Sequence, residues 1–320
     1  MASKPLSLCA LHDLTRDIEE TRNLCGEWNL FQDFSGPCGK CTSTPPGTVS
    51  LVRRARLSDG ALWQCSKCKR SISLRKESWF SGSHLSLSDI LKLTWMWVHK
   101  VPAATICVEL GAAEHTAADW ASFCREVCGL FLSKCSKKIG GPGKTVEIDE
   151  SKFGKRKYNR GRHVDGQWVL GGIERESKRS FFAPVEKRDA ETLIPIIEAY
   201  VEPGTTIITD CWKAYSTLGE RGYIHQVVNH SKEFVSEEGF HTNTIESTWH
   251  ALKRSLPRYG ARTGMYNAYF EEYIVRKLHL RDSDDPFLAF LEIISSIYPG
   301  TGIPCEHNYS RKTSGVDEGT

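Results

Sequence analysis

Apolar residues in the C-terminal half of the chain change their spacing from one stretch to the next. Five stretches have the length and β-branched content of strands, and they cover residues 145–151, 167–174, 180–185, 205–209 and 224–228. Three others repeat apolar residues at helical spacing, over 190–201, 212–218 and 244–256. The pattern predicts an α/β domain, a mixed five-stranded sheet with helices.

The order of these elements also predicts where three acidic side chains lie. Three strands followed by helix, strand, helix, strand and helix is the order of a ribonuclease-H-like fold, in which the first and fourth strands are neighbours. Asp149 lies in the first strand and Asp210 ends the fourth, so we expect their carboxylates to face each other. In the last helix Ile245 and Trp249 begin a buried apolar stripe, and Glu246 lies beside that stripe at the edge of the cleft.

The N-terminal half combines helical patterns with a segment rich in glycine, proline, serine and cysteine. Helical spacing marks residues 11–25, 85–99, 103–110 and 117–133, and strand-like pieces cover 49–57 and 61–65. A short turn containing Gly111 joins the last two helices. Helix, turn and helix predict a helix-turn-helix-like unit whose second helix reads DNA. The alternative is an ordinary three-helix packing unit.

Two pairs of cysteines indicate a metal site in the segment between these helices. The pairs are Cys38-x-x-Cys41 and Cys65-x-x-Cys68, and a turn, a basic strand, a second turn and a second strand separate them. That order is typical of a zinc ribbon, in which two knuckles share one tetrahedral ion. Thiolates are soft ligands that suit zinc. We expect a structural Zn²⁺ that stabilises a segment with few apolar residues.

The glycine-rich run at 140–143 marks the clearest boundary in the chain. The predicted organisation is an N-terminal helical segment, a zinc ribbon, a helical DNA-binding unit, a ribonuclease-H-like catalytic domain and a flexible tail, over residues 1–33, 34–82, 83–139, 144–298 and 299–320. The length of 320 residues, with 40% apolar and 25% charged residues, agrees with a globular protein of two or three domains.

Nothing in the composition predicts export or a membrane. The first residues lack the apolar core of a signal peptide, and no run of about eighteen apolar residues occurs. We therefore expect a reducing intracellular compartment, where the twelve cysteines bind metal more often than they form disulfides.

Positive charge is concentrated in two segments although the net charge of the whole chain is only +3. Residues 51–76 hold eight basic side chains against one acidic one, and residues 134–163 hold ten against three. Clustered positive charge is the electrostatic footprint of a polyanionic partner. Two solvated basic faces are the alternative.

Three converging carboxylates are the ligand set for chemistry on phosphodiesters. Two Mg²⁺ or Mn²⁺ ions at Asp149, Asp210 and Glu246 would activate the nucleophile and stabilise the leaving oxygen. Basic side chains near these acids are candidates for binding DNA phosphates, and they are Lys152, Lys155, Arg156, Lys157, Lys213, Lys253, Arg254 and Arg258. The roles of His230, His241 and Asn243 stay open between proton transfer, DNA contact, helix capping and polar loop positions.

Four sequence motifs around these acids carry a family resemblance. They are VEIDESKFG over 146–154, the glycine pair 171–172, TDCWKAY over 209–215 and HTNTIESTW over 241–249. Together with the zinc ribbon they resemble the DDE transposases of the Merlin superfamily and the related bacterial insertion-sequence transposases with an ISXO-like domain, across residues 35–280. Asp149, Asp210 and Glu246 match the three acidic positions of that family, and Glu246 is the residue of Merlin elements where some bacterial relatives have Asn.

The resemblance implies cut-and-paste movement of double-stranded DNA. Cleavage at terminal inverted repeats and strand transfer by a 3′-hydroxyl into target DNA would follow, in a homodimer or larger assembly on DNA. It also implies residence in the nucleus for a eukaryotic element and in the cytoplasm otherwise. Two other functions stay open, a domesticated DNA-binding protein without catalysis and a plain ribonuclease-H-like nuclease.

Overall fold

The computed structural model describes residues 4–135, 137–154, 166–210, 213–228, 242–257 and 263–298. Contacts divide the chain into two compact units, one formed by Met1–Leu8 with Lys92–Phe290 and the other by Cys9–Leu91 with Leu291–Thr320. The larger unit holds all three acidic candidates. The division into five segments stays a prediction.

A mixed five-stranded sheet forms the centre of the larger unit. Its strands are β6 (Thr145–Phe153), β7 (Gln167–Glu174), β8 (Ser180–Val185), β10 (Thr206–Asp210) and β11 (Ile224–Val228). They lie in the order β11-β10-β6-β7-β8, with β6, β7 and β8 antiparallel and with β10 and β11 parallel to β6. The first and fourth strands of this sheet are therefore neighbours, as the sequence predicts, and the topology is ribonuclease-H-like.

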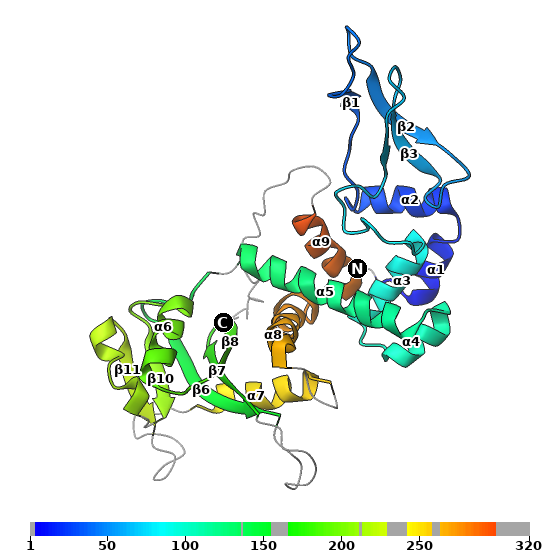
Figure 1. Cartoon of the computed structure of the whole chain (residues 1–320). Coiled ribbons are helices and arrows are strands. Elements are labelled where there is room, and N and C mark those ends of the chain that lie inside the picture. Colours follow the sequence, from blue (N-terminus) through cyan, green and yellow to red (C-terminus); the bar gives the residue numbers. More distant parts are fainter. Residues whose placement is uncertain are drawn as a thin grey trace, which may run out of the picture. The chain divides into compact units, whose positions relative to one another are not determined.

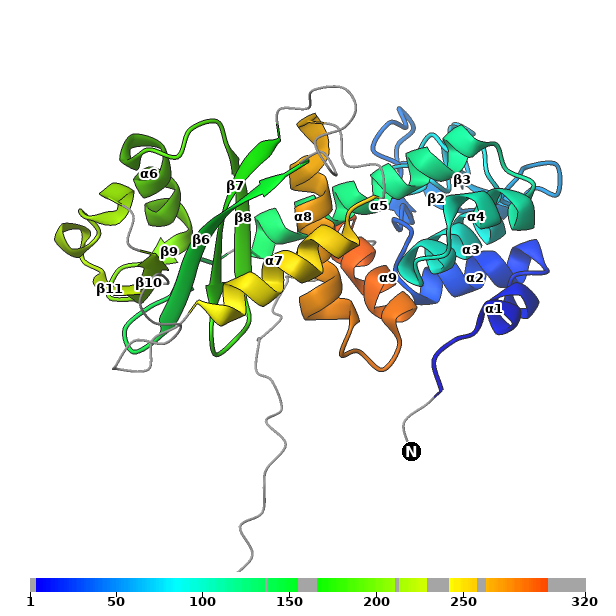
Figure 2. The ribbon, with the colours of Figure 1, turned by 90° about the horizontal axis from the view of Figure 1, so that it is seen from below.

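Helices cover both faces of this sheet (Figure 2). Helix α6 (Ala190–Tyr200) lies on one face, and α7 (Asn243–Ser255) and α8 (Tyr266–Val275) lie on the other. Because successive strand residues point to opposite faces, β6 contributes Val146 and Ile148 to the core beneath α6 and Phe153 to the core beneath α7 and α8.

Three further helices belong to the helical part of the chain, α3 (Leu87–Val98), α4 (Ala103–Leu110) and α5 (Glu114–Cys135). Gly111 ends α4 in the left-handed conformation at φ 59°, which a glycine adopts without steric cost. Helix α5 packs against α8, where Arg125 pairs with Glu272 at 3.7 Å. The predicted helix-turn-helix-like order is present in α4 and α5, and its contact with DNA stays a prediction.

The chain beyond α8 continues as a five-residue π-helix, η5 (Arg276–Leu280), and a last helix, α9 (Pro286–Ile297). The predicted helix over 212–218 is wrong in its type: the described residues form two short 3₁₀ turns, η2 (Lys213–Tyr215) and η3 (Gly219–Arg221). Gly222, at φ 85°, ends the second turn. The segment from Lys213 to Gly222 is therefore too short for a stable α-helix. Among the described helices, none has the length and apolar character to cross a membrane.

The smaller unit contains a four-stranded antiparallel sheet (Figure 1). Its strands are β1 (Gly36–Pro37), β2 (Thr48–Arg53), β3 (Ala61–Cys65) and β4 (Ser71–Ser73). The single helix expected over 11–25 is instead two, α1 (Leu8–Leu14) and α2 (Ile18–Glu27). Asp17 separates them because its carboxylate accepts hydrogen bonds from the backbone N–H groups of Glu19 and Glu20, which begins a new helix.

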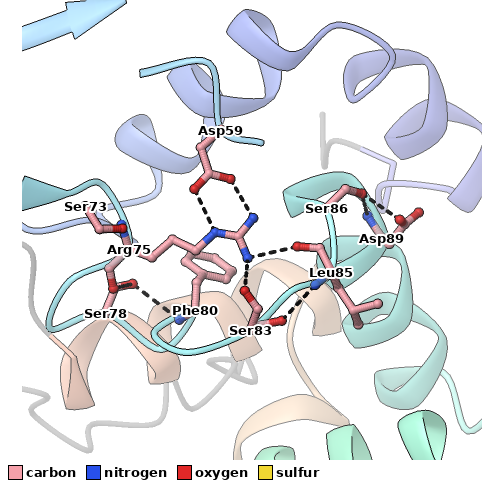
Figure 3. A network of polar contacts seen from close by, with 9 residues as sticks. All are labelled: Asp59, Ser73, Arg75, Ser78, Phe80, Ser83, Leu85, Ser86 and Asp89. Carbon is pink, nitrogen blue, oxygen red and sulfur yellow. Dashed lines mark hydrogen bonds and ion pairs between the residues drawn. The ribbon is translucent and has the colours of Figure 1, made fainter. Parts of the chain in front are cut away.

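A buried ion pair closes the turn between β2 and β3 (Figure 3). Arg75 donates to both carboxylate oxygens of Asp59, at 2.8 and 2.5 Å, and to the carbonyls of Ser83 and Leu85 at 3.0 and 2.8 Å. Arg75 is only 6% exposed. Arg75 belongs to the first of the two basic segments of the sequence. Its charge is paired with Asp59 inside the protein and is therefore not available to a polyanion.

Candidate active site

Parallel pairing of β10 with β6 brings the two aspartates to the same level of the sheet. Across the two strands, Thr206 pairs with Thr145, Ile207 with Val146 and Ile208 with Glu147. Two residues further in the same register, Asp210 is level with Asp149. The strand order therefore places Asp149 and Asp210 at the same level of neighbouring strands, as the sequence predicts.

Helix α7 lies along β6 and is fixed to it at three successive points. Glu147 accepts from the backbone N–H of Ile245 at 2.8 Å, the indole N–H of Trp249 donates to Asp149 at 2.9 Å, and the Lys253 ammonium donates to the Ser151 hydroxyl at 2.6 Å. Two strand residues advance about 6.7 Å and four helical residues about 6 Å. The two elements therefore stay in step over these contacts.

The first of these contacts depends on a buried glutamate. Glu147 has no exposed area, and its other oxygen accepts from Arg175 at 2.7 Å. Two donors satisfy the hydrogen-bonding capacity of this buried carboxylate. Its negative charge also interacts favourably with the positive end of the helix dipole at the start of α7. Glu147 thus determines where α7 begins, and with it the position of Glu246.

The second contact depends on a glycine opposite Asp149. Gly171 pairs with Asp149 across β6 and β7. A Cβ atom at position 171 would lie 2.4 Å from Cη2 of Trp249, far closer than van der Waals contact. The absent side chain is what lets the indole lie over the sheet and reach the carboxylate.

Glu246 follows on the exposed side of α7, one residue after the N–H that Glu147 holds. Burial raises the pKa of Asp149, and the negative charges of Asp210 and Glu246 raise it further, while hydrogen bonds from Trp249 and the backbone lower it. Both other acids therefore act on Asp149 electrostatically. The structure brings the three predicted carboxylates to one place.

A fourth carboxylate, not identified from the sequence, lies behind these three. Glu150 follows Asp149 on β6 and so points to the opposite face, where the Tyr215 hydroxyl donates to it and Arg188 lies 4.0 Å away. Burial and the charges of Asp149 and Asp210 raise the pKa of Glu150 to about 8, and Arg188 opposes this. The only sequence signal was the adjacency of two acids, since Tyr215 is distant in the chain.

The carboxylate oxygens of the acidic trio are candidate ligands for divalent cations. Among the described residues, one group of three or more Cys, His, Asp or Glu side chains has all its ligand atoms within 4.8 Å of one another. That group consists of cysteines. In the described part of the chain, the oxygens of Asp149, Asp210 and Glu246 do not form a set that tight. Hard carboxylate oxygens are suitable ligands for Mg²⁺ or Mn²⁺.

The predicted DNA-binding side chains fall into different places. Lys253 on α7 donates to Ser151 of β6, on the face that carries Asp149. Lys152 lies on the other face of β6, with its ammonium 5.6 Å from the centre of the Trp168 ring. Lys213 is exposed just beyond β10. Arg254 lines a cavity at another edge of α7. The remaining predicted residues, Lys155, Arg156, Lys157 and Arg258, lie outside the described residues, as do His230 and His241. Asn243 begins α7.

The cysteine pairs of the smaller unit approach one another. The sulfur atoms of Cys38, Cys65 and Cys68 lie within 4.8 Å of one another. A hydrogen bond with the Ser43 hydroxyl, and a weaker one with Cys65, lower the pKa of Cys41 to about 6, so Cys41 lies beside the same set. Four thiols in this arrangement fit a Zn²⁺ ion in their chemistry.

The backbone next to these sulfurs is unusually close. A Cβ atom at Gly47 would lie 2.6 Å from the sulfur of Cys65 and 2.9 Å from the backbone nitrogen of Lys67. The backbone N–H of Cys38 also donates to the carbonyl of Gly47, at 2.8 Å. Gly47 therefore lets the two knuckles approach each other.

Residues 139–277 match the ISXO2-like transposase domain. Over 110 residues the chain is 26% identical to an uncharacterized transposase-like protein of Haemophilus influenzae, which corresponds to 34% of this chain and 85% of that protein.

Solved structures give weaker likenesses. The HTLV-2 integrase catalytic core domain in complex with magnesium has a TM-score of 0.30 and 13% identity, over 44% of this chain and 87% of that one. A pre-cleavage Mos1 transpososome has a TM-score of 0.27 and 10% identity, over 65% and 76%. The fold assignment rests on the strand order.

Proposed function

We propose that this chain, which carries an ISXO2-like transposase domain over residues 139–277, cuts DNA at the ends of a mobile element and joins those ends to a target. The reaction class is hydrolysis of a phosphodiester followed by transesterification with a DNA 3′-hydroxyl. The observation that carries the proposal is the alignment of α7 along β6 beside β10, which brings Asp149, Asp210 and Glu246 together on a ribonuclease-H-like sheet.

In this proposal Asp149, Asp210 and Glu246 would together hold two divalent ions. When bound, two such ions activate the attacking oxygen and stabilise the leaving oxygen. Without them, three carboxylates repel one another, and this repulsion adds to burial, the larger cause, in raising the pKa of Asp149. Binding of cations would remove that repulsion.

The neighbouring side chains hold the acids in place. Trp249 donates to one oxygen of Asp149 and leaves the other free of that contact. Glu147 fixes the start of α7, and Lys253 at the same edge offers a positive charge to a DNA phosphate. Ligands oriented by such partners bind metal more tightly than unrestrained ones.

The N-terminal elements suit recognition of DNA. We propose that the four-cysteine site binds structural Zn²⁺ and that the ribbon and the α4–α5 unit bind the terminal inverted repeats. The resemblance to Merlin-type elements supports this part, together with an assembly of two or more copies that joins two DNA ends.

A nicking assay tests the function. Purified full-length protein is incubated with supercoiled plasmid, with and without the DNA that flanks its gene, in Mn²⁺ or Mg²⁺. We expect nicking that needs the metal and disappears in Asp149→Asn, Asp210→Asn and Glu246→Gln, with DNA binding retained. Glu198→Gln, a surface acid paired with Arg221, is the matched control and should keep wild-type activity.

Binding without any nicking by the wild type would contradict the enzymatic proposal and favour a DNA-binding protein without catalysis. Nicking that survives in Asp210→Asn would contradict the assignment of the site.

A further inference from the structure

Two cavities lie side by side along the edge of α7 that faces away from the acids. Their volumes are ≈ 570 and ≈ 450 Å³, and both are lined by Ala251, Tyr273, Lys277 and Arg281. Shared walls make them one continuous depression between α7 and η5, here named the α7–η5 groove. All its lining residues belong to the larger unit.

The groove is separate from the acidic cleft. Ala251 lies five residues after Glu246, which is about 140° around a helix of 3.6 residues per turn. The side chains of Trp249 and Lys253, which contact Asp149 and Ser151, mark the opposite edge of α7. Helix α7 therefore separates the groove from the cleft, and one molecule of DNA could contact both edges.

Positive charge dominates the groove. The smaller cavity is lined by Lys178, Lys277 and Arg281, and no acidic side chain occurs among its described lining residues. The larger cavity adds Lys100 and Arg254 and contains one acid, Glu272.

That one acid is already paired. One oxygen of Glu272 accepts from Arg276 at 2.7 Å, and the other lies 3.7 Å from Arg125. Its charge therefore does not neutralise the lysines of the groove.

The pKa of Lys277 is lowered in this arrangement. Its side chain is half-buried, and burial, together with repulsion from Arg281 and Lys178, lowers the pKa of Lys277 to about 8. An anion in the groove would remove that repulsion. Among these three cations, Arg281 has an acid beside it, the exposed Asp282 at 3.6 Å. Three like charges against one exposed acid outside the cavity lining are typical of a site whose counter-charge comes from a ligand.

The element that carries these charges is held in place before any ligand binds. Arg276, at the start of η5, donates to the carbonyls of Val98 and Trp97 at 2.7 and 2.8 Å and to Glu272. The π-helical backbone bond from Arg281 to the carbonyl of Arg276, at 3.0 Å, places Arg281 on the same turn as Lys277. π-helical turns occur often at functional sites.

We propose that the α7–η5 groove binds the backbone phosphates of DNA that runs past α7 from the cleavage site. The cations are spread from Lys100 and Arg254 in one cavity to Lys178 in the other, which suits a ligand with repeated charges better than a single small anion. The inference rests on the proposed function for the identity of its ligand, and contacts to phosphates would position the DNA without reading its sequence.

The test measures DNA binding as a function of salt, with full-length protein and a fluorescent DNA duplex in the absence of added Mg²⁺ and Mn²⁺. Each phosphate contact contributes about 0.9 to the slope of log K against log salt. Lys277→Met/Arg281→Gln should therefore lower that slope by about 1.8 and weaken binding about tenfold at moderate salt. The control Lys187→Ala/Arg221→Ala loses the same charge at exposed positions outside both cavities and outside the two basic segments, and it should leave the slope within about 0.5 of the wild-type value.

A second pair of variants tests charge at Ala251, which lines both cavities. Ala251 is an exposed helical residue, so Ala251→Glu and Ala251→Gln should both fold. We expect the Glu variant to weaken DNA binding several-fold more than the Gln variant. Equal binding by the two, or equal salt slopes for the groove variant and its control, would overturn the inference.

The outcome is separable from that of the proposed function. Plasmid nicking by the wild type reports on the acids, and the difference in salt slope reports on the groove. A lowered slope without any nicking would leave the groove standing and remove the enzymatic proposal. Nicking with an unchanged slope would do the reverse, and a wild type that binds no DNA would overturn both.

Discussion

Replacement of Gly171 by alanine should weaken metal binding at a site that the new methyl group does not touch. The added Cβ would lie 2.4 Å from Cη2 and 2.7 Å from Cζ2 of Trp249, so the indole must move. Its N–H then loses the 2.9 Å bond to Asp149. Loss of such an orienting partner typically costs about 10–100-fold in metal affinity, or about 1.4–2.7 kcal/mol.

The neighbouring glycine provides a matched control. A Cβ at Gly172 would lie 2.3 Å from Cε1 of Phe181, a clash of the same severity on the opposite face of the sheet. Both variants should lose about 1–3 kcal/mol of stability through overpacking. Only Gly171→Ala should also lose Mn²⁺ affinity.

Isothermal calorimetry with Mn²⁺ measures the affinity and urea denaturation measures the stability. The double variant Gly171→Ala/Trp249→Phe separates the two effects, because the smaller ring relieves the clash but has no N–H to donate. We expect its stability to recover toward the wild-type value while its Mn²⁺ affinity stays low. Equal Mn²⁺ affinities in Gly171→Ala and Gly172→Ala would refute the role given to Trp249.

Three further predictions concern other buried groups. Because the pKa of Glu150 is raised to about 8, the folded protein holds this proton more tightly than the unfolded chain does, so stability is full below about pH 4.5 and falls as pH rises to 8. Glu150→Gln should therefore gain roughly 1–3 kcal/mol over wild type between pH 5 and pH 8.5 in metal-free urea denaturation, and a constant difference would contradict this. Arg75→Met should cost about 3–5 kcal/mol, because it leaves Asp59 buried without its partner, and Asp59→Leu in the same chain should recover part of the loss in thermal unfolding. Cys65→Ser should reduce bound zinc, measured by atomic absorption, from one ion per chain to none, whereas Cys107→Ser should retain it.

The strands of the C-terminal half could be predicted from the sequence because their signal is local. The bounds expected for 167–174, 180–185 and 224–228 coincide with β7, β8 and β11, since alternation and flanking turns define each strand without reference to the rest of the fold. The order of those strands then fixed Asp149 and Asp210 as neighbours. Glu246 followed from the apolar stripe of its helix.

Contacts between distant residues could not be predicted in this way. Trp249 fits the apolar stripe and is 4% exposed, but nothing local showed that its N–H reaches Asp149. Glu150 meets Tyr215 only because β6 and η2 pack together. By contrast, the break between α1 and α2 was readable: Asp17 followed by Glu20 is a capping-box pattern.

The central claim is that Asp149, Asp210 and Glu246 form one site for two divalent ions. X-ray diffraction from crystals soaked in Mn²⁺ tests it most directly, through the anomalous difference map. The account predicts two peaks about 3.5–4 Å apart, with Asp149, Asp210 and Glu246 all among the coordinating side chains. Peaks that bind other acids, or a site from which Glu246 is absent, would contradict it.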